Sequence, residues 1–148
     1  MIFDKISSDI VAAMKAKDKV RLMALRTVKK YFIEAKTAPG ASDELSDDEA
    51  IKILAKLAKQ GRDTADIYVG QSRQDLADEE LAQVAVIEEY LPRQLSIDEL
   101  RAELQTIIAQ VGASGPKDMG KVMGQATKAL VGRAEGKVIS AMVRDLLT

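Results

Sequence analysis

The chain of 148 residues contains no cysteine, no histidine and no tryptophan. These absences exclude disulfide bonds, Ser-His-Asp and Cys-His catalysis, and zinc sites built from Cys and His ligands. Any catalysis would have to use carboxylates, lysines, hydroxyl groups or backbone amides. Aromatic residues are also scarce, and there are five of them: Phe3, Tyr31, Phe32, Tyr68 and Tyr90.

Proline is rare, with three residues, and strong helix formers dominate the composition. Hydrophobic residues make up 47% of the chain and charged residues 30%, as in a globular protein rather than a disordered one. No apolar run approaches the roughly 20 residues that span a bilayer, and the first residues lack the pattern of a secretory signal. We therefore expect an all-α cytoplasmic protein without a membrane span, metal or cofactor.

Apolar residues recur at helical spacing in seven segments, and no segment has a convincing strand pattern. The expected helices cover residues 4–16, a stretch ending near 36, 46–70, 73–90, 96–111, 116–130 and a last stretch after 136. The segments 46–49 and 96–99 each match a capping box. Leu95, directly before the second box, is expected to pack against Leu100 as a hydrophobic staple. Gly61 inside the third helix predicts a close helix crossing or a bend.

A joint between two helical parts is expected near Leu91-Pro92, since the residue before proline disfavours helix. We expect a four-helix part over residues 1–92 and a three-helix part over 93–148. Charge is segregated along the chain although its net value is −1. Residues 1–40 hold nine basic and four acidic side chains (+5), residues 41–95 six and thirteen (−7), and residues 96–148 seven and six (+1). These blocks matter more for partner choice than the net charge.

The segment from Gly115 to Val122 matches the spacing of a phosphate-binding loop, but Val122 replaces the Ser or Thr that would hold Mg²⁺. A helical pattern precedes the segment where a strand is required, so we reject nucleotide binding. On a helix, Lys117, Lys121 and Lys128 instead fall within a sector of about 40°. We call this the lysine face.

The lysine face suggests contact with the phosphates of structured RNA, because no aromatic ring lies nearby to stack on unpaired bases. Arg133 and Lys137 lie in or beside the following turn, and glycines would let an RNA backbone approach. The candidate nucleic-acid-binding residues are Lys117, Gly120, Lys121, Gly124, Lys128, Arg133, Gly136 and Lys137. The alternative is that these lysines form an ordinary solvated helix surface.

Other charged groups have simpler explanations. A second basic set, Lys19, Arg26, Lys29 and Lys30, is expected to extend from a helix packed between neighbours. We expect the acidic residues 78–80 and 88–89 to lie on exposed helix surfaces. No catalytic pair of carboxylates is indicated. The acidic segment 41–95 suggests an alternative function, an adaptor that docks on a basic protein partner.

Several segments, taken in order, resemble the GatB/YqeY family over essentially the whole chain. They are residues 45–49, 57–63, 73–77, 88–96, 117–123 and 132–137. The chain looks like a free-standing YqeY-like protein. One departure is Gly61, where relatives often have a basic residue before Arg62.

The resemblance implies an all-α fold with a four-helix and a three-helix part. A similar domain forms the C-terminal, tRNA-contacting region of the B subunit of the glutamine-dependent tRNA amidotransferase, a carbon–nitrogen ligase of bacteria. Carried over, residues 117–123 and 132–137 would face tRNA. The chain resembles only this appended domain. A description of the chain as a ligase would therefore derive from the complete enzyme and not from this domain. We expect a non-catalytic module that binds tRNA or a tRNA-handling enzyme.

Overall fold

The computed structural model describes residues 1–148 and is helical throughout, with no strand. Its helices are α1 (Ile2–Ala16), α2 (Lys19–Thr37), α3 (Asp47–Gly70), α4 (Gln74–Glu88), α5 (Ile97–Val111), the 3₁₀ turn η1 (Pro116–Asp118), α6 (Met119–Ala129) and α7 (Gly136–Leu147). The predicted all-α fold of seven α-helices is confirmed. No helix is both long enough and apolar enough to cross a bilayer.

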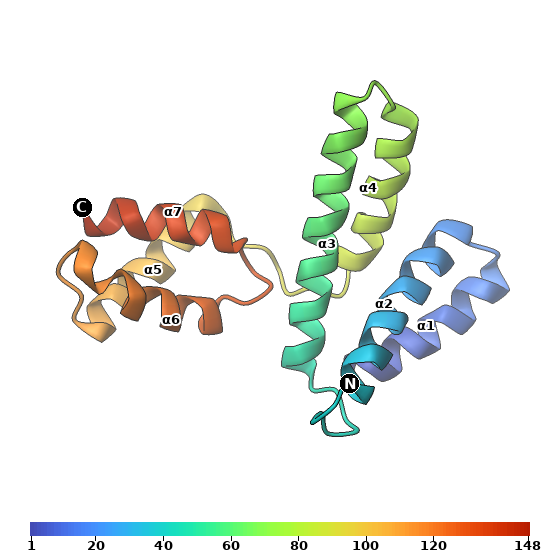
Figure 1. Cartoon of the computed structure of the whole chain (residues 1–148), viewed down its shortest axis with the longest axis horizontal. Helices are drawn as coiled ribbons and strands as arrows, with labels where there is room; N and C mark the ends of the chain where they lie inside the picture. Colours follow the sequence, from blue (N-terminus) through green and yellow to red (C-terminus); the bar gives the residue numbers. More distant parts are fainter. The chain divides into compact units, whose positions relative to one another are not determined.

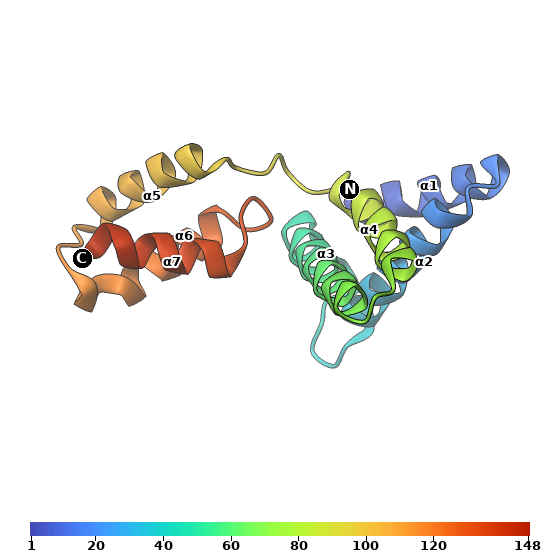
Figure 2. The same cartoon turned by 90° about the horizontal axis from the view of Figure 1, so that it is seen from above.

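The chain forms two compact units, unit 1 from Met1 to Leu91 and unit 2 from Pro92 to Thr148. In unit 1, α1 and α2 form one helical hairpin and α3 and α4 form another (Figures 1 and 2). Their shared core is built around Phe32 of α2, which is completely buried. Side chains from all four helices pack into this core, among them Ile6, Leu25, Leu54, Ala58 and Val84.

Gly61 lies where α3 crosses α4, so its predicted role in a close helix crossing is correct. A methyl group placed on Gly61 would overlap the Cγ2 atom of Val84 in α4. The close approach therefore requires a residue without a side chain, although glycine costs about 1 kcal/mol relative to alanine inside a helix. This packing explains why position 61 holds glycine rather than a residue with a side chain.

The start of α3 departs from the predicted capping box. The Ser46 side chain accepts a hydrogen bond from the Glu49 amide at 3.2 Å, but the reciprocal bond from the Ser46 amide to Glu49 is absent. Glu49 is exposed, and an exposed carboxylate gains little by exchanging water for one amide. The neighbouring Asp47 instead accepts from the backbone amide of Ile2 at 2.9 Å, which links the starts of α1 and α3.

Two helix boundaries also differ from the prediction. α4 ends at Glu88 rather than at residue 90, because Tyr90 precedes Leu91-Pro92 and its side chain is held by other helices. The helix expected over 116–130 begins with the 3₁₀ turn η1, and α-helical geometry starts at Met119. The Asp118 carboxylate accepts from the Ser114 amide at 2.9 Å and holds this tighter turn.

Unit 2 has its own core among α5, α6 and α7. Its completely or almost completely buried side chains include Leu100, Leu104, Val122, Leu130 and Val143. The capping box at the start of α5 is present as predicted, since Ser96 and Glu99 exchange both hydrogen bonds. Leu95 packs against this core, as expected of a staple. Arg93 also binds the Glu99 carboxylate through two nitrogens, and these contacts lower the Glu99 pKa to about 2.

We predict that Gly61→Ala destabilises unit 1 by about 1–2 kcal/mol, because overpacking against Val84 outweighs the better helix propensity of alanine. Urea denaturation followed by tyrosine fluorescence measures the effect, since all five aromatic residues belong to unit 1. Gly70→Ala in the same helix is the matched control: a methyl group there meets nothing within 4 Å, so this variant should lose no stability. Unchanged or increased stability of Gly61→Ala would refute the close crossing.

Candidate functional site

The lysine face occupies the solvent side of η1 and α6. Lys117, Lys121 and Lys128 are all exposed, and none of them forms an ion pair. The opposite side of α6 is inserted into the core of unit 2 through Val122 and Ala126, both completely buried. Because the buried stripe fixes the rotation of the helix, the lysines cannot turn inward.

One carboxylate lies within this basic surface. The Ser114 backbone amide lowers the pKa of Asp118, and the positive charges of Lys121 and Lys117 lower it further. Asp118 therefore stays ionised and places a negative charge between two of the three lysines. Its structural task is to hold η1, so the charge offsets part of the positive field at that end of the face.

The three candidate glycines are not required by the packing of the chain. A methyl group placed on Gly120, Gly124 or Gly136 would meet nothing within 4 Å, in contrast with Gly61. All three have ordinary negative φ angles, so the backbone does not demand glycine at these positions either. Two of them lie in α6, where alanine would give a more stable helix. Their presence is consistent with a surface that a ligand backbone approaches closely.

The remaining candidates, Arg133 and Lys137, differ from one another. Arg133 is half-buried in the connection between α6 and α7, and its backbone carbonyl accepts from the Leu95 amide at 2.9 Å. Lys137 is exposed in the first turn of α7. It lines a groove with Arg101 of α5 rather than with the residues of α6. The eight candidates therefore divide into a set on η1 and α6 and a set in the α6–α7 connection and the first turn of α7.

The groove between α5 and α7 has a volume of about 380 Å³ and is mostly apolar. We call it the α5–α7 groove. Its lining residues are Arg101, Lys137, Val138, Ala141, Met142, Asp145 and Leu146. Arg101 is not among the residues predicted from the sequence, because the helical spacing of α5 does not show that Arg101 lies beside α7. The sequence offered one local signal, the apolar Val138 directly after Lys137, and the structure leaves Val138 37% exposed.

The second basic set lies on α2. Lys19, Arg26 and Lys30 are exposed and Lys29 is half-buried, while the opposite side of α2 carries the buried core residues. The Lys30 ammonium group lies 5.6 Å from the ring centre of Tyr31. This arrangement agrees with the expected helix that packs on one side and extends its basic groups to solvent.

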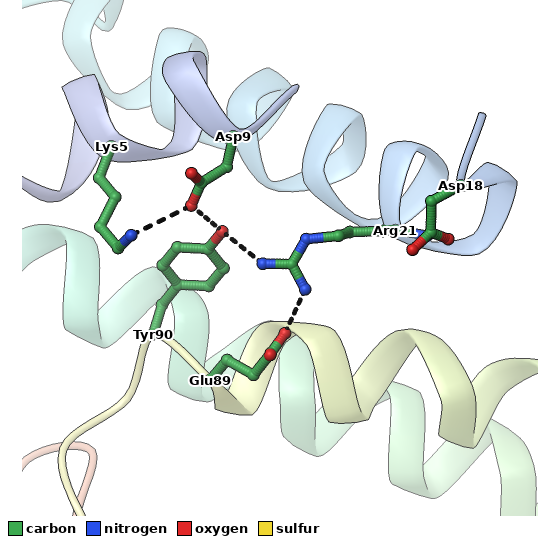
Figure 3. A network of polar contacts seen from close by, with 6 residues as sticks. All are labelled: Lys5, Asp9, Asp18, Arg21, Glu89 and Tyr90. Carbon is green, nitrogen blue, oxygen red and sulfur yellow. Dashed lines mark hydrogen bonds and ion pairs between the residues drawn. The ribbon is translucent and has the colours of Figure 1, made fainter. Parts of the chain in front are cut away.

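A polar network in unit 1 joins three helices (Figure 3). The Tyr90 hydroxyl donates to Asp9 of α1 at 2.5 Å and accepts from Arg21 of α2 at 3.3 Å. Arg21 also binds Glu89 at 2.6 Å, and Lys5 lies 3.3 Å from Asp9. Every member has a partner inside the unit, so the network fastens the end of α4 onto the α1–α2 hairpin.

The network shifts the titration of its members. The hydrogen bond from Tyr90 lowers the pKa of the Asp9 carboxyl, with a smaller contribution from Lys5. Burial raises the pKa of the Tyr90 phenol, and the bond to Asp9 raises it further. The bond to Glu89 raises the pKa of the Arg21 guanidinium. Each shift favours the protonation state that the network needs, with Tyr90 neutral and Asp9 charged.

Part of the acidic segment 41–95 is engaged in ion pairs within unit 1. Glu88 pairs with Arg62 at 3.0 Å, Glu89 with Arg21, and Asp75 with Arg73 at 3.0 Å. The run 78–80 forms no ion pair, and Asp78 accepts from Gln74 at 2.8 Å. No group of three or more acidic side chains converges in a way that would hold a metal ion.

These features define an all-α protein of two helical units whose second unit presents unpaired lysines on one side of α6. The family model described as Yqey-like protein matches residues 3–147. The chain therefore belongs to the YqeY-like family, the GatB/YqeY type. No curated protein matches the chain.

We predict that Tyr90→Phe destabilises unit 1 by about 1 kcal/mol at neutral pH, because Asp9 and Arg21 lose their shared hydroxyl partner. The folded-state pKa of Asp9 is depressed, so its stabilising effect is present above the ordinary value of 3.8 and is lost as pH falls through the depressed value. Urea denaturation of both proteins at several pH values should show the difference shrink in acid. An undiminished difference in acid, or none at neutral pH, would contradict the structural role of the network.

Proposed function

We propose that this protein is a non-catalytic accessory module that binds tRNA through unit 2. The observation that carries the proposal is the lysine face, which presents Lys117, Lys121 and Lys128 to solvent without ion-pair partners. Phosphate groups attract such unpaired cations, and binding releases the counterions that surround the nucleic acid. The tRNA-contacting region of the amidotransferase B subunit, which this chain resembles, supports tRNA as the RNA.

The three lysines suit the backbone of a folded RNA rather than its sequence. Gly120 and Gly124 leave the surface of α6 low between the lysine side chains, so a ribose-phosphate backbone could lie close to the helix. Contacts to phosphate and to ribose hydroxyl groups recognise the shape of an RNA helix. The protein would then help a tRNA-handling enzyme hold its substrate without doing chemistry itself.

Docking of a basic protein on the acidic segment 41–95 is the weaker candidate. Arg62, Arg21 and Arg73 already pair with carboxylates of that segment. Those carboxylates would have to give up partners before they could bind a new one, whereas the run 78–80 forms no ion pair and is open to a basic partner. The lysines of the lysine face have no ion pair to break, and the resemblance to a tRNA-contacting region favours this surface over the acidic run.

We predict that the double variant Lys121→Gln, Lys128→Gln weakens tRNA binding by at least about ten-fold at low salt. In a plot of log K against log salt concentration, its slope should be shallower than that of the wild type by about 2, one for each phosphate contact removed. Filter binding or fluorescence anisotropy with labelled total tRNA measures both quantities.

The matched control is Lys52→Gln, Lys56→Gln, which removes the same charge from exposed lysines on α3 of unit 1. This variant should retain the affinity and nearly the whole salt dependence of the wild type. Equal losses in both double variants would mean that only net charge matters, and absent or salt-independent tRNA binding by the wild type would refute the proposed function.

A further inference from the structure

We propose that the α5–α7 groove takes one unstacked base of the bound RNA. This inference rests on the proposed function and deepens it, because it adds base recognition to the phosphate contacts of the lysine face. The groove has a volume of about 380 Å³, which is ample for a single base. Lys137 lies at the groove and would hold the phosphate of the same nucleotide.

The lining suits the flat, apolar faces of a base. Val138, Ala141, Met142 and Leu146 supply aliphatic surface from α7. Unit 2 has no aromatic ring, so a base cannot stack there in the usual way. The planar guanidinium group of Arg101 replaces the ring, because arginine planes stack on bases in RNA-binding proteins. Its partner Asp98 is 3.7 Å away and almost fully exposed, so this weak ion pair leaves Arg101 able to reorient.

The one carboxylate in the groove determines which bases fit. Asp145 forms no ion pair, and an ionised carboxylate can only accept hydrogen bonds. It therefore suits the exocyclic amino groups of cytosine, adenine and guanine, whereas uracil has no amino group and offers the carboxylate only its single N3–H donor. The groove should prefer a base that carries an amino group over uracil.

The shape of the groove favours a base over a protein helix. A docked helix uses anchors spread over two or more turns of both walls. Here α7 contributes residues 137–146, a length of about 14 Å, but α5 contributes Arg101 alone. One wall is thus a single side chain, which matches one planar group rather than a row of anchors. Lys137 forms no ion pair and can meet the phosphate of that nucleotide.

The test compares two RNA probes: a short hairpin with an all-cytidine loop, and a fully paired RNA duplex of the same length. The variant Ala141→Leu fills the groove at an exposed helical position without changing charge. The wild type should bind the cytidine hairpin more tightly than the duplex. Ala141→Leu should lower hairpin affinity by about ten-fold, the range of one base stack, and leave duplex affinity unchanged.

The matched control is Ala109→Leu, which adds the same side chain at an exposed position of α5 outside both the groove and the lysine face and should change neither affinity. A uridine-loop hairpin tests the role of Asp145: the wild type should bind it more weakly than the cytidine hairpin, and Asp145→Asn should abolish that difference. Circular dichroism establishes that each variant is folded.

The outcomes separate the inference from the proposed function. If the wild type binds no RNA, the proposed function fails and the inference fails with it. If both probes bind and Ala141→Leu weakens neither, or weakens the hairpin and the duplex equally, the base-binding groove is refuted while phosphate binding by the lysine face stands. A selective loss for the hairpin, as expected of an occupied groove, supports the inference.

Discussion

The buried apolar stripe of α6 is the constraint on which the surface of unit 2 depends. Val122, Ala126 and Leu130 have essentially no exposure to solvent, so α6 has one rotation about its axis that satisfies the core. Turning the helix would bury lysine charges without partners, at a large cost in free energy. The side of α6 on which the lysines lie is therefore a consequence of how the core is packed.

The two units use their charges differently. At the junction of α1, α2 and α4 in unit 1, Arg21, Asp9 and Glu89 satisfy one another through Tyr90, and their charges serve the internal structure (Figure 3). In unit 2, the Arg93–Glu99 pair serves the same internal purpose at the start of α5. The lysines of α6 and Lys137 of α7 have no such partners. The basic set of α2 is largely exposed and without ion pairs as well, so the case for unit 2 rests on the glycines beside its lysines, which the packing does not require.

Helical periodicity, proline and glycine positions and capping residues were enough to predict the all-α fold and its seven helices. The capping box at Ser96 and Glu99 was predicted correctly, because its hydrogen bonds join residues only three positions apart in the sequence. Local signals failed where a residue far along the chain decides the outcome. Asp47 binds the Ile2 amide beside an incomplete capping box, and Tyr90 leaves the end of α4 to reach Asp9. The α5–α7 groove likewise could not be predicted from the sequence, because it forms only where Arg101 of α5 lies beside α7.

Nuclear magnetic resonance titration of the ¹⁵N-labelled protein with tRNA tests the central claim most directly, since it reports each residue separately. The account predicts chemical-shift changes at low salt for amides of η1, α6 and the first turn of α7. These changes should disappear at high salt, while amides of α3 and α4 remain unperturbed. Changes confined to unit 1, or changes in α6 that persist at high salt, would contradict the assignment of tRNA binding to the lysine face.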